Sequence, residues 1–192
     1  MLVLPVALAA CGGGGEPKPL RLDALVLRPA DLGPRFSRFD VGPQTRLDAH
    51  EGPRHDPERF GRQDGWKARF RRAGATAATA GPLVVDSRVD AFRDEGGAKD
   101  DLEAYEEEWN TTVVASGATH ADRTRVDGLG DDARALDLLQ GTRRTGQRLI
   151  VVAWRAGRVT ASVSVTGFAS KLTLAEVVAL ARRQDTHIER AV

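Results

Sequence analysis

The stretch RVTASVSVT, residues 158–166, decides the fold class of this chain. Valine and alanine side chains alternate in it with hydroxyl-bearing or basic side chains, at a period of two residues. That alternation is typical of a β-strand with one apolar face. Residues 147–155 (QRLIVVAWR) form a second apolar run, and the Ala156-Gly157 pair between the two runs predicts a tight turn. The sequence therefore predicts a β-hairpin over residues 147–166.

Further strands are predicted on the N-terminal side of this hairpin. Residues 133–139 form a third strand candidate, and the loop GTRRTG (141–146) joins it to the hairpin. Consecutive strands joined by short loops must run antiparallel. Residues 65–72 (GWKARFRR) and 83–92 (LVVDSRVDAF) also alternate, and residues 35–41 show a weaker strand pattern. These runs predict an antiparallel sheet.

Two helices are predicted, over residues 94–109 and from residue 174 to about residue 190. In the first helix, Ala98, Leu102, Tyr105 and Trp109 recur at helical spacing and form one apolar stripe. The second helix begins at TLAE (173–176), a capping box. Helices are the elements available to cover the apolar face of the sheet. We therefore expect an α+β fold, an antiparallel β-sheet with two main helices packed on one face.

The N-terminus carries a motif for lipid attachment. Leu8-Ala9-Ala10-Cys11 follows an apolar run and precedes four glycines, and it resembles the lipobox of bacterial lipoproteins. The resemblance implies cleavage before Cys11, a lipid on its sulfur, and an anchor on the extracytoplasmic face of the cell membrane. Residues 1–10 are then a signal peptide, residues 11–20 a tether, and residues 21–192 a single globular domain. Since no basic residue precedes Cys11, we expect the natural start to lie upstream of Met1.

The composition limits the kinds of partner. Basic and acidic residues number 28 and 27, for a net charge of +1, so no long-range field favours nucleic acid. Cys11 is the single cysteine of the chain, which excludes an internal disulfide. The predicted domain must therefore be stabilised by its core.

No pattern in the chain predicts a cofactor, a metal site or a catalytic group, and we expect a protein that is not an enzyme. His50 and His55 lie in a proline-broken loop, where a surface metal site is a weaker alternative to a solvated loop. The acidic residues at 100–101 and 106–108 could pair for acid–base chemistry, but we interpret them as the solvent-exposed face of the first helix. Residues 126–133 (VDGLGDDA) are interpreted as a turn into a strand, because they lack the pattern of a phosphate or calcium loop.

The arginines outside the helices suggest a different kind of contact. Arg69, Arg71 and Arg72 lie on a predicted strand, and Arg143 and Arg144 lie in a predicted loop. Gathered in space they would suit anionic headgroups near the tether, although a solvated surface is the simpler interpretation.

The phrases PADLGPRF, VDGLGDDARAL and VAWRAGRVTASVSVTG, followed by a capped terminal helix, resemble actinobacterial sensor-type lipoprotein domains. The extracellular sensor domain of mycobacterial PknH-type kinases is a more distant comparison. This resemblance implies an extracytoplasmic fold of mixed α and β structure with no established activity. Our hypothesis is a binding or sensing module of the cell envelope for a small molecule or an envelope protein. It requires a concave apolar pocket between helix and sheet. An envelope hydrolase without a recognisable motif and a structural or assembly lipoprotein are the alternatives.

Overall fold

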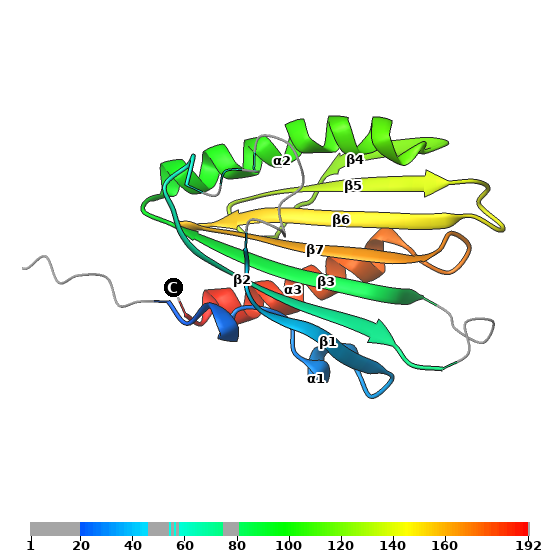
Figure 1. The fold of residues 1–192 in the computed structure, drawn as a ribbon, viewed down its shortest axis with the longest axis horizontal. Helices are drawn as coiled ribbons and strands as arrows, with labels where there is room; N and C mark the ends of the chain where they lie inside the picture. The colour runs from blue at the N-terminus through cyan, green and yellow to red at the C-terminus, as the bar shows by residue number, and fades with distance from the viewer. Residues whose placement is uncertain (1–19, 46–53, 55, 57, 75–80, 192) are drawn as a thin grey trace, which may run out of the picture.

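One antiparallel sheet organises the structure (Figure 1), a computed structural model that describes residues 20–45, 54, 56, 58–74 and 81–191. Its strands are β1 (Phe36–Pro43), β2 (Arg62–Arg72), β3 (Pro82–Phe92), β4 (His120–Arg125), β5 (Asp132–Gln140), β6 (Gln147–Ala156) and β7 (Val159–Phe168). The helices are α1 (Pro29–Leu32), α2 (Glu95–Ser116) and α3 (Leu174–Glu189), after a 3₁₀ turn at Leu22–Ala24.

The strand order is β1-β2-β3-β7-β6-β5-β4, and all neighbouring strands are antiparallel. The chain lays down β1 to β3, crosses the sheet along α2, and starts again at the far edge with β4 (Figure 1). It then returns strand by strand until β7 pairs with β3. The 22 residues of α2 span roughly 33 Å at the standard helical rise, long enough for that crossing.

The predicted fold class, α+β with an antiparallel sheet, is confirmed. The predicted strands and both main helices are present, with bounds shifted by a few residues except at the end of α2. The predicted polar connection over residues 110–125 is wrong, because it contains the end of α2 and all of β4. Val113 packs against the apolar cluster beneath α2, and Gly117 ends the helix in the left-handed conformation. Every residue of β4 is exposed, which removes the alternation that would reveal a strand.

The expectation that both helices cover one face is also wrong, because α2 and α3 lie on opposite faces of the sheet. Tyr105 and Trp109 of α2 pack with Ala153, whereas Val177 of α3 packs in the cluster that contains Val152. Adjacent residues of one strand point to opposite faces, so the two helices are on either side of β6. Figure 1 shows α3 behind the strands. The physical reason is that the central strands carry apolar residues on both faces and need a cover on each.

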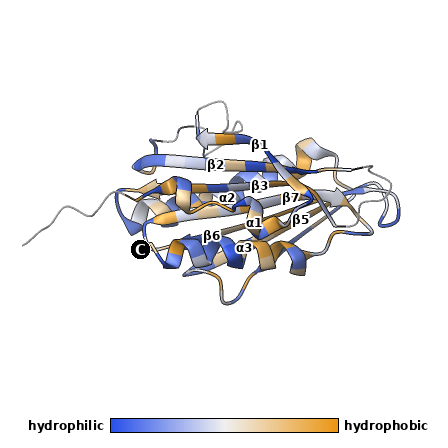
Figure 2. Ribbon diagram, turned by 90° about the horizontal axis from the view of Figure 1, so that it is seen from below, coloured by the Kyte–Doolittle hydropathy of each residue, from blue (hydrophilic) through white to orange (hydrophobic). Residues whose placement is uncertain are grey.

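The larger apolar core lies between the sheet and α3. Phe70, Val85, Val163 and Trp154 are fully buried there, and the core also includes Leu22, Leu25, Val26 and Leu27. Figure 2 shows hydrophobic and hydrophilic residues alternating along α3, as an amphipathic helix on a sheet requires. None of the helices in the described part of the chain is both long enough and apolar enough to cross a membrane.

The loop before β5 is held by a carboxylate of α3. The predicted turn at residues 126–133 is present and leads into β5, with Gly130 at a φ of +53°. A Cβ at Gly130 would lie 2.2 Å from the carbonyl oxygen of Arg155, so this close approach requires glycine. The Gly130 amide donates to Asp185 Oδ2 over 3.2 Å, while Trp154 Nε1 donates to Asp185 Oδ1 over 2.8 Å. The loop, β6 and α3 are thereby tied at one buried carboxylate.

The predicted capping box of α3 is confirmed and supports a stability prediction. Thr173 Oγ1 accepts from the Glu176 amide, and Glu176 Oε2 accepts from the Thr173 amide. Thr173→Ala should lower the free energy of unfolding by about 1 kcal/mol. Val177→Ala should lower it by roughly 1–3 kcal/mol, because Val177 is fully buried. Val178 is only partly buried, so Val178→Ala should cost less than Val177→Ala.

Urea denaturation of the three variants measures these differences. Equal unfolding free energies for wild type and Val177→Ala would contradict the placement of α3 on the core.

Candidate functional site

A cleft of about 200 Å³ lies between α2 and the sheet, on the face opposite α3. It has room for a small organic molecule, because one buried water needs only about 10–15 Å³ of such space. Residues of α2, β3, β5, β6 and β7 line it, with Arg54 from the segment before β2 and Arg69 from β2. The lining is Arg54, Arg69, Asp86, Arg88, Tyr105, Glu108, Trp109, Thr112, Leu136, Leu149, Val151, Ser162 and Ser164. This is the helix-on-sheet pocket that a binding module requires.

The cleft divides into an apolar part and a polar part. Leu136, Leu149 and Val151 come from neighbouring strands β5 and β6, and Trp109 lies against them from α2. Tyr105 and Trp109, one helical turn apart, meet edge to face with ring centroids 6.3 Å apart. The polar part begins at Tyr105, whose hydroxyl donates to Ser162 Oγ over 3.1 Å.

Arg54 is the centre of the polar part. Its Nε donates to Asp101 Oδ1 over 2.8 Å, and its Nη2 donates to Asp90 Oδ2 over 3.2 Å. Its guanidinium carbon lies 3.5 Å from the centroid of the Tyr105 ring, a cation–π contact. Its Nη1 lies 3.8 Å from Glu108 Oε2. Arg54 thus connects its own segment to α2 and β3.

A second group of charges extends the polar part toward the β1 edge. Arg69 Nε donates to Asp86 Oδ2 over 3.0 Å, and Arg69 Nη1 lies 3.4 Å from Asp40 Oδ2. Arg88 Nη2 also donates to Asp86 Oδ2, over 2.9 Å. Asp40, Arg69, Asp86 and Arg88 therefore alternate in sign across three strands, and each charge is paired with its neighbour.

Burial shifts the pKa of several of these groups. Burial raises the pKa of Asp90, an effect that the cations of Arg62 and Arg54 oppose. Burial disfavours the charge of Arg54, but the carboxylates of Asp101 and Asp90 more than offset this and raise its pKa. Burial also raises the pKa of the Tyr105 phenol to about 12. The tyrosine therefore stays protonated, and Arg54 stays charged, across the physiological range.

The Tyr105 pKa leads to a direct prediction, because Tyr105 is the single tyrosine of the chain. Tyrosinate absorbance should titrate near pH 12 in the folded protein and near pH 10 in denaturant. A folded pKa above the unfolded value stabilises the fold below pH ~10, and that contribution is lost as the pH rises from about 10 to about 12. A folded-state titration at pH ~10 would contradict the burial of Tyr105 against Arg54.

The acidic residues of α2 divide between the cleft and the solvent. Asp101 and Glu108 are 4% and 9% exposed, so the interpretation of these two as a solvent-exposed face is wrong. Asp100 and the pair at 106–107 are exposed, as predicted. Positions 101, 105 and 108 share one helix face at i, i+4 and i+7, a signal present in the sequence. Nothing in the local sequence indicated that Arg54 would supply their cation.

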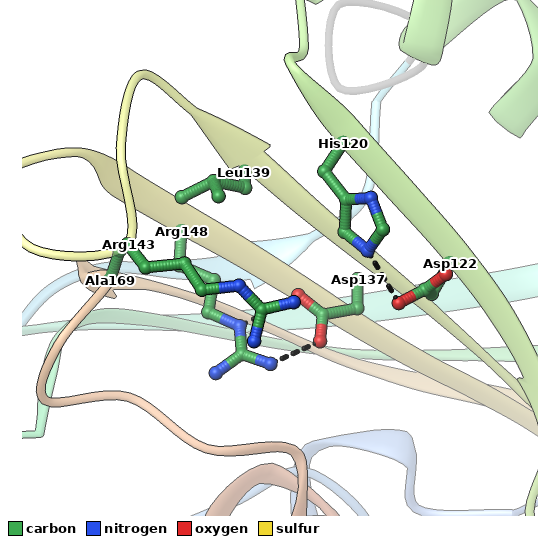
Figure 3. A pocket seen from close by; sticks show the side chains of 7 residues that line it. All are labelled: His120, Asp122, Asp137, Leu139, Arg143, Arg148 and Ala169. Carbon is green, nitrogen blue, oxygen red and sulfur yellow. Dashed lines mark hydrogen bonds and ion pairs between the residues drawn. The ribbon is translucent and has the colours of Figure 1, made fainter.

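A smaller hollow of about 80 Å³ lies over β4, β5 and β6 on the α3 side of the sheet (Figure 3). His120 Nε2 lies 2.8 Å from Asp122 Oδ2, and Arg148 Nε donates to Asp137 Oδ1 over 2.7 Å. Figure 3 shows the Arg143 guanidinium extending toward Asp137. The His120–Asp122 pair is exposed on the edge strand β4, where such a pair contributes little, whereas the Arg148–Asp137 pair is partly buried between β5 and β6.

The other sequence candidates do not gather into one site. Cys11, His50 and His55 lie outside the described residues. Arg69 is occupied by Asp40 and Asp86, and β2 is three strand positions from β6, roughly 14 Å at the usual spacing. The basic residues of β2 and of the 141–146 loop are therefore apart. Within the part of the chain that the structure describes, no group of three or more potential ligands is arranged to hold a metal ion.

No protein-family model and no curated protein matches this chain. Among solved structures, the crystal structure of the extracellular domain of PknH from Mycobacterium tuberculosis is similar, with a TM-score of 0.61. The match covers 88% of this chain and 95% of that chain, at 12% sequence identity. This similarity confirms the fold that the sequence resemblance implied. At such an identity it shows the fold alone, since one fold serves many functions.

Proposed function

We propose that this protein is an extracytoplasmic, sensor-like module that binds a small molecule in the cleft beneath α2. A lipid on Cys11 would hold it on the outer face of the cell membrane. The observation that carries the binding function is the cleft itself, a concavity with an apolar wall and converging polar groups. The extracytoplasmic location is supported by the lipobox resemblance and by the similarity in fold to an extracellular domain.

The chemistry of the cleft residues supports binding rather than catalysis. The Tyr105 phenol keeps its proton to about pH 12, so it does not serve as a base near neutrality. Asp90 and Asp101 both accept hydrogen bonds from Arg54, and Asp86 accepts from Arg69 and Arg88. Carboxylates held this way order the wall of a binding site.

The cleft assignment is tested with two adjacent threonines of α2. Thr112 lines the cleft and Thr111 is exposed, so Thr112→Trp should fill the cleft while Thr111→Trp should not. The full chain is purified from envelope membranes, and co-purifying small molecules are identified by native mass spectrometry. We expect wild type and Thr111→Trp to retain one shared molecule that Thr112→Trp lacks. The same molecule on Thr112→Trp at the same occupancy would contradict the assignment.

The anchor is tested separately. Cys11→Ala should abolish incorporation of labelled fatty acid and move the protein from the membrane fraction to the soluble fraction, because no other residue of the chain offers a thiol. The measurement uses a bacterial host and a gene with its natural upstream start. Undiminished incorporation by Cys11→Ala would contradict a lipid on this residue.

A further inference from the structure

We infer that the cleft beneath α2 takes an amphipathic ligand whose polar end donates a hydrogen bond, an alcohol or an amine, and that it disfavours an anionic head group. This inference rests on the proposed function and specifies its ligand class. It is carried by one atom, Oε2 of Glu108. Glu108 lines the cleft, and its Oε2 is buried and accepts no hydrogen bond from any described residue.

Glu108 differs from every other acid around the cleft in this respect. Its residue is 9% exposed, so Oε2 has lost most of its access to water. The nearest cation is Arg54 Nη1 at 3.8 Å, beyond hydrogen-bonding distance. Buried acceptors are nearly always paired, and this one has no partner among the residues that the structure describes. A ligand hydroxyl or ammonium in the cleft would supply that donor.

Arg54 does not hydrogen-bond to Glu108 because two other carboxylates fix the position of its guanidinium group, which leaves Nη1 3.8 Å from Glu108 Oε2. Asp101 takes Nε and Asp90 takes Nη2. Asp90 is shared with Arg62, whose Nε lies 2.6 Å from Asp90 Oδ1. Two guanidinium groups thus face three carboxyl groups in this cluster, and Glu108 is the one held at the longest distance. A donor is favoured beside Glu108, and a second anion there would be repelled.

The remaining arginines of the cleft do not reverse this preference. Arg69 and Arg88 both donate to Asp86, and Arg69 also reaches Asp40. An incoming carboxylate or phosphate would compete with an anion that is already in place. The arginines of this second charge group already bind carboxylates, so Glu108 is the group that we expect to bind the ligand's polar end.

The apolar end of the ligand has its own surface. Leu136, Leu149 and Val151 present aliphatic side chains from β5 and β6, and Trp109 adds an aromatic surface from α2. Glu108 and Trp109 both line the cleft, so one ligand can meet the donor position and the apolar wall. A short aliphatic chain ending in a donor matches both at once.

Three probes of equal chain length test the head-group preference: octan-1-ol, octylammonium and octanoate at neutral pH. The protein is the full chain carrying Cys11→Ala, without the lipid. Binding is followed by NMR through the indole resonance of Trp109 and the methyl resonances of Leu149 and Val151. We expect the alcohol and the ammonium to bind at least tenfold more tightly than octanoate.

Matched variants assign the effect to one atom. Glu108→Gln should lower the affinity for octylammonium at least tenfold and bring it close to that for octanoate. Glu107→Gln, on the exposed face of the same helix, should leave all three affinities unchanged. Thr112→Trp should remove binding of all three probes, which confirms that the signals report the cleft.

The outcomes separate this inference from the proposed function. Octanoate binding as tightly as the other probes, or affinities unchanged by Glu108→Gln, would overturn the head-group inference and leave the binding function intact. No binding by any probe, together with identical co-purified molecules on wild type and Thr112→Trp, would overturn both.

Discussion

Replacing Arg54 by methionine is expected to lower the free energy of unfolding by about 3–5 kcal/mol, the usual cost of removing one partner from a buried ion pair. The Arg54 side chain is 15% exposed and sits among the carboxyl groups of Asp90, Asp101 and Glu108. Without its charge, Asp101 keeps the Thr160 hydroxyl as a donor, at 2.6 Å, and loses its cation. Urea denaturation measures the change.

Two further variants make the Arg54 result specific. Arg59→Met, at an exposed position of the same segment, should change stability by no more than about 0.5 kcal/mol. Adding Asp101→Asn to Arg54→Met should recover part of the loss, since it removes a carboxylate that has lost its cation. If Arg54→Met were as stable as Arg59→Met, the charge cluster would not be buried as described.

Replacing Trp154 by alanine should have an effect of similar size, about 3–5 kcal/mol, because a large core side chain is lost and a cavity remains. Trp154 is fully buried, and its indole donates to Asp185 Oδ1 over 2.8 Å. Trp154→Phe keeps much of the packing but leaves a buried carboxylate oxygen without that donor, at a cost of about 1–3 kcal/mol.

The order of the Trp154 variants checks the argument. Wild type, Trp154→Phe and Trp154→Ala should unfold at successively lower urea concentrations. A cost below about 1 kcal/mol for Trp154→Ala would place this residue outside the core.

The strands that the sequence predicted most clearly are those with one apolar face. In β7, Val159, Ala161, Val163 and Val165 lie on the α3 face, and the opposite face carries Thr160, Ser162 and Ser164. A tight turn at Gly157 joins β6 to β7, so the antiparallel pairing of these two strands follows from chain geometry. β4 escaped prediction because all of its residues are exposed, and it is held by pairing with β5.

The candidate site was harder to predict because it depends on contacts between distant segments. The run LIVVAW in β6 is apolar at nearly every position, which is typical of a strand buried on both faces. A strand that is apolar on both faces needs a covering element on each face of the sheet, and this run therefore indicated one helix on each face. The burial of Asp101 and Glu108 follows from the same arrangement, since α2 turns that face toward the sheet.

The sequence by itself determined the α+β class, the hairpin around Gly157, and the capping box that begins α3, because these depend on residues within a few positions of one another. Only the tertiary structure decided that α2 and α3 take opposite faces and that Arg54 meets carboxylates from β3 and α2. It also decided that Glu108 Oε2 has no hydrogen-bond donor among the described residues. The opposite faces follow from apolar residues on both sides of the central strands. The charge contacts depend on which buried groups find partners, and those partners lie far away in the chain.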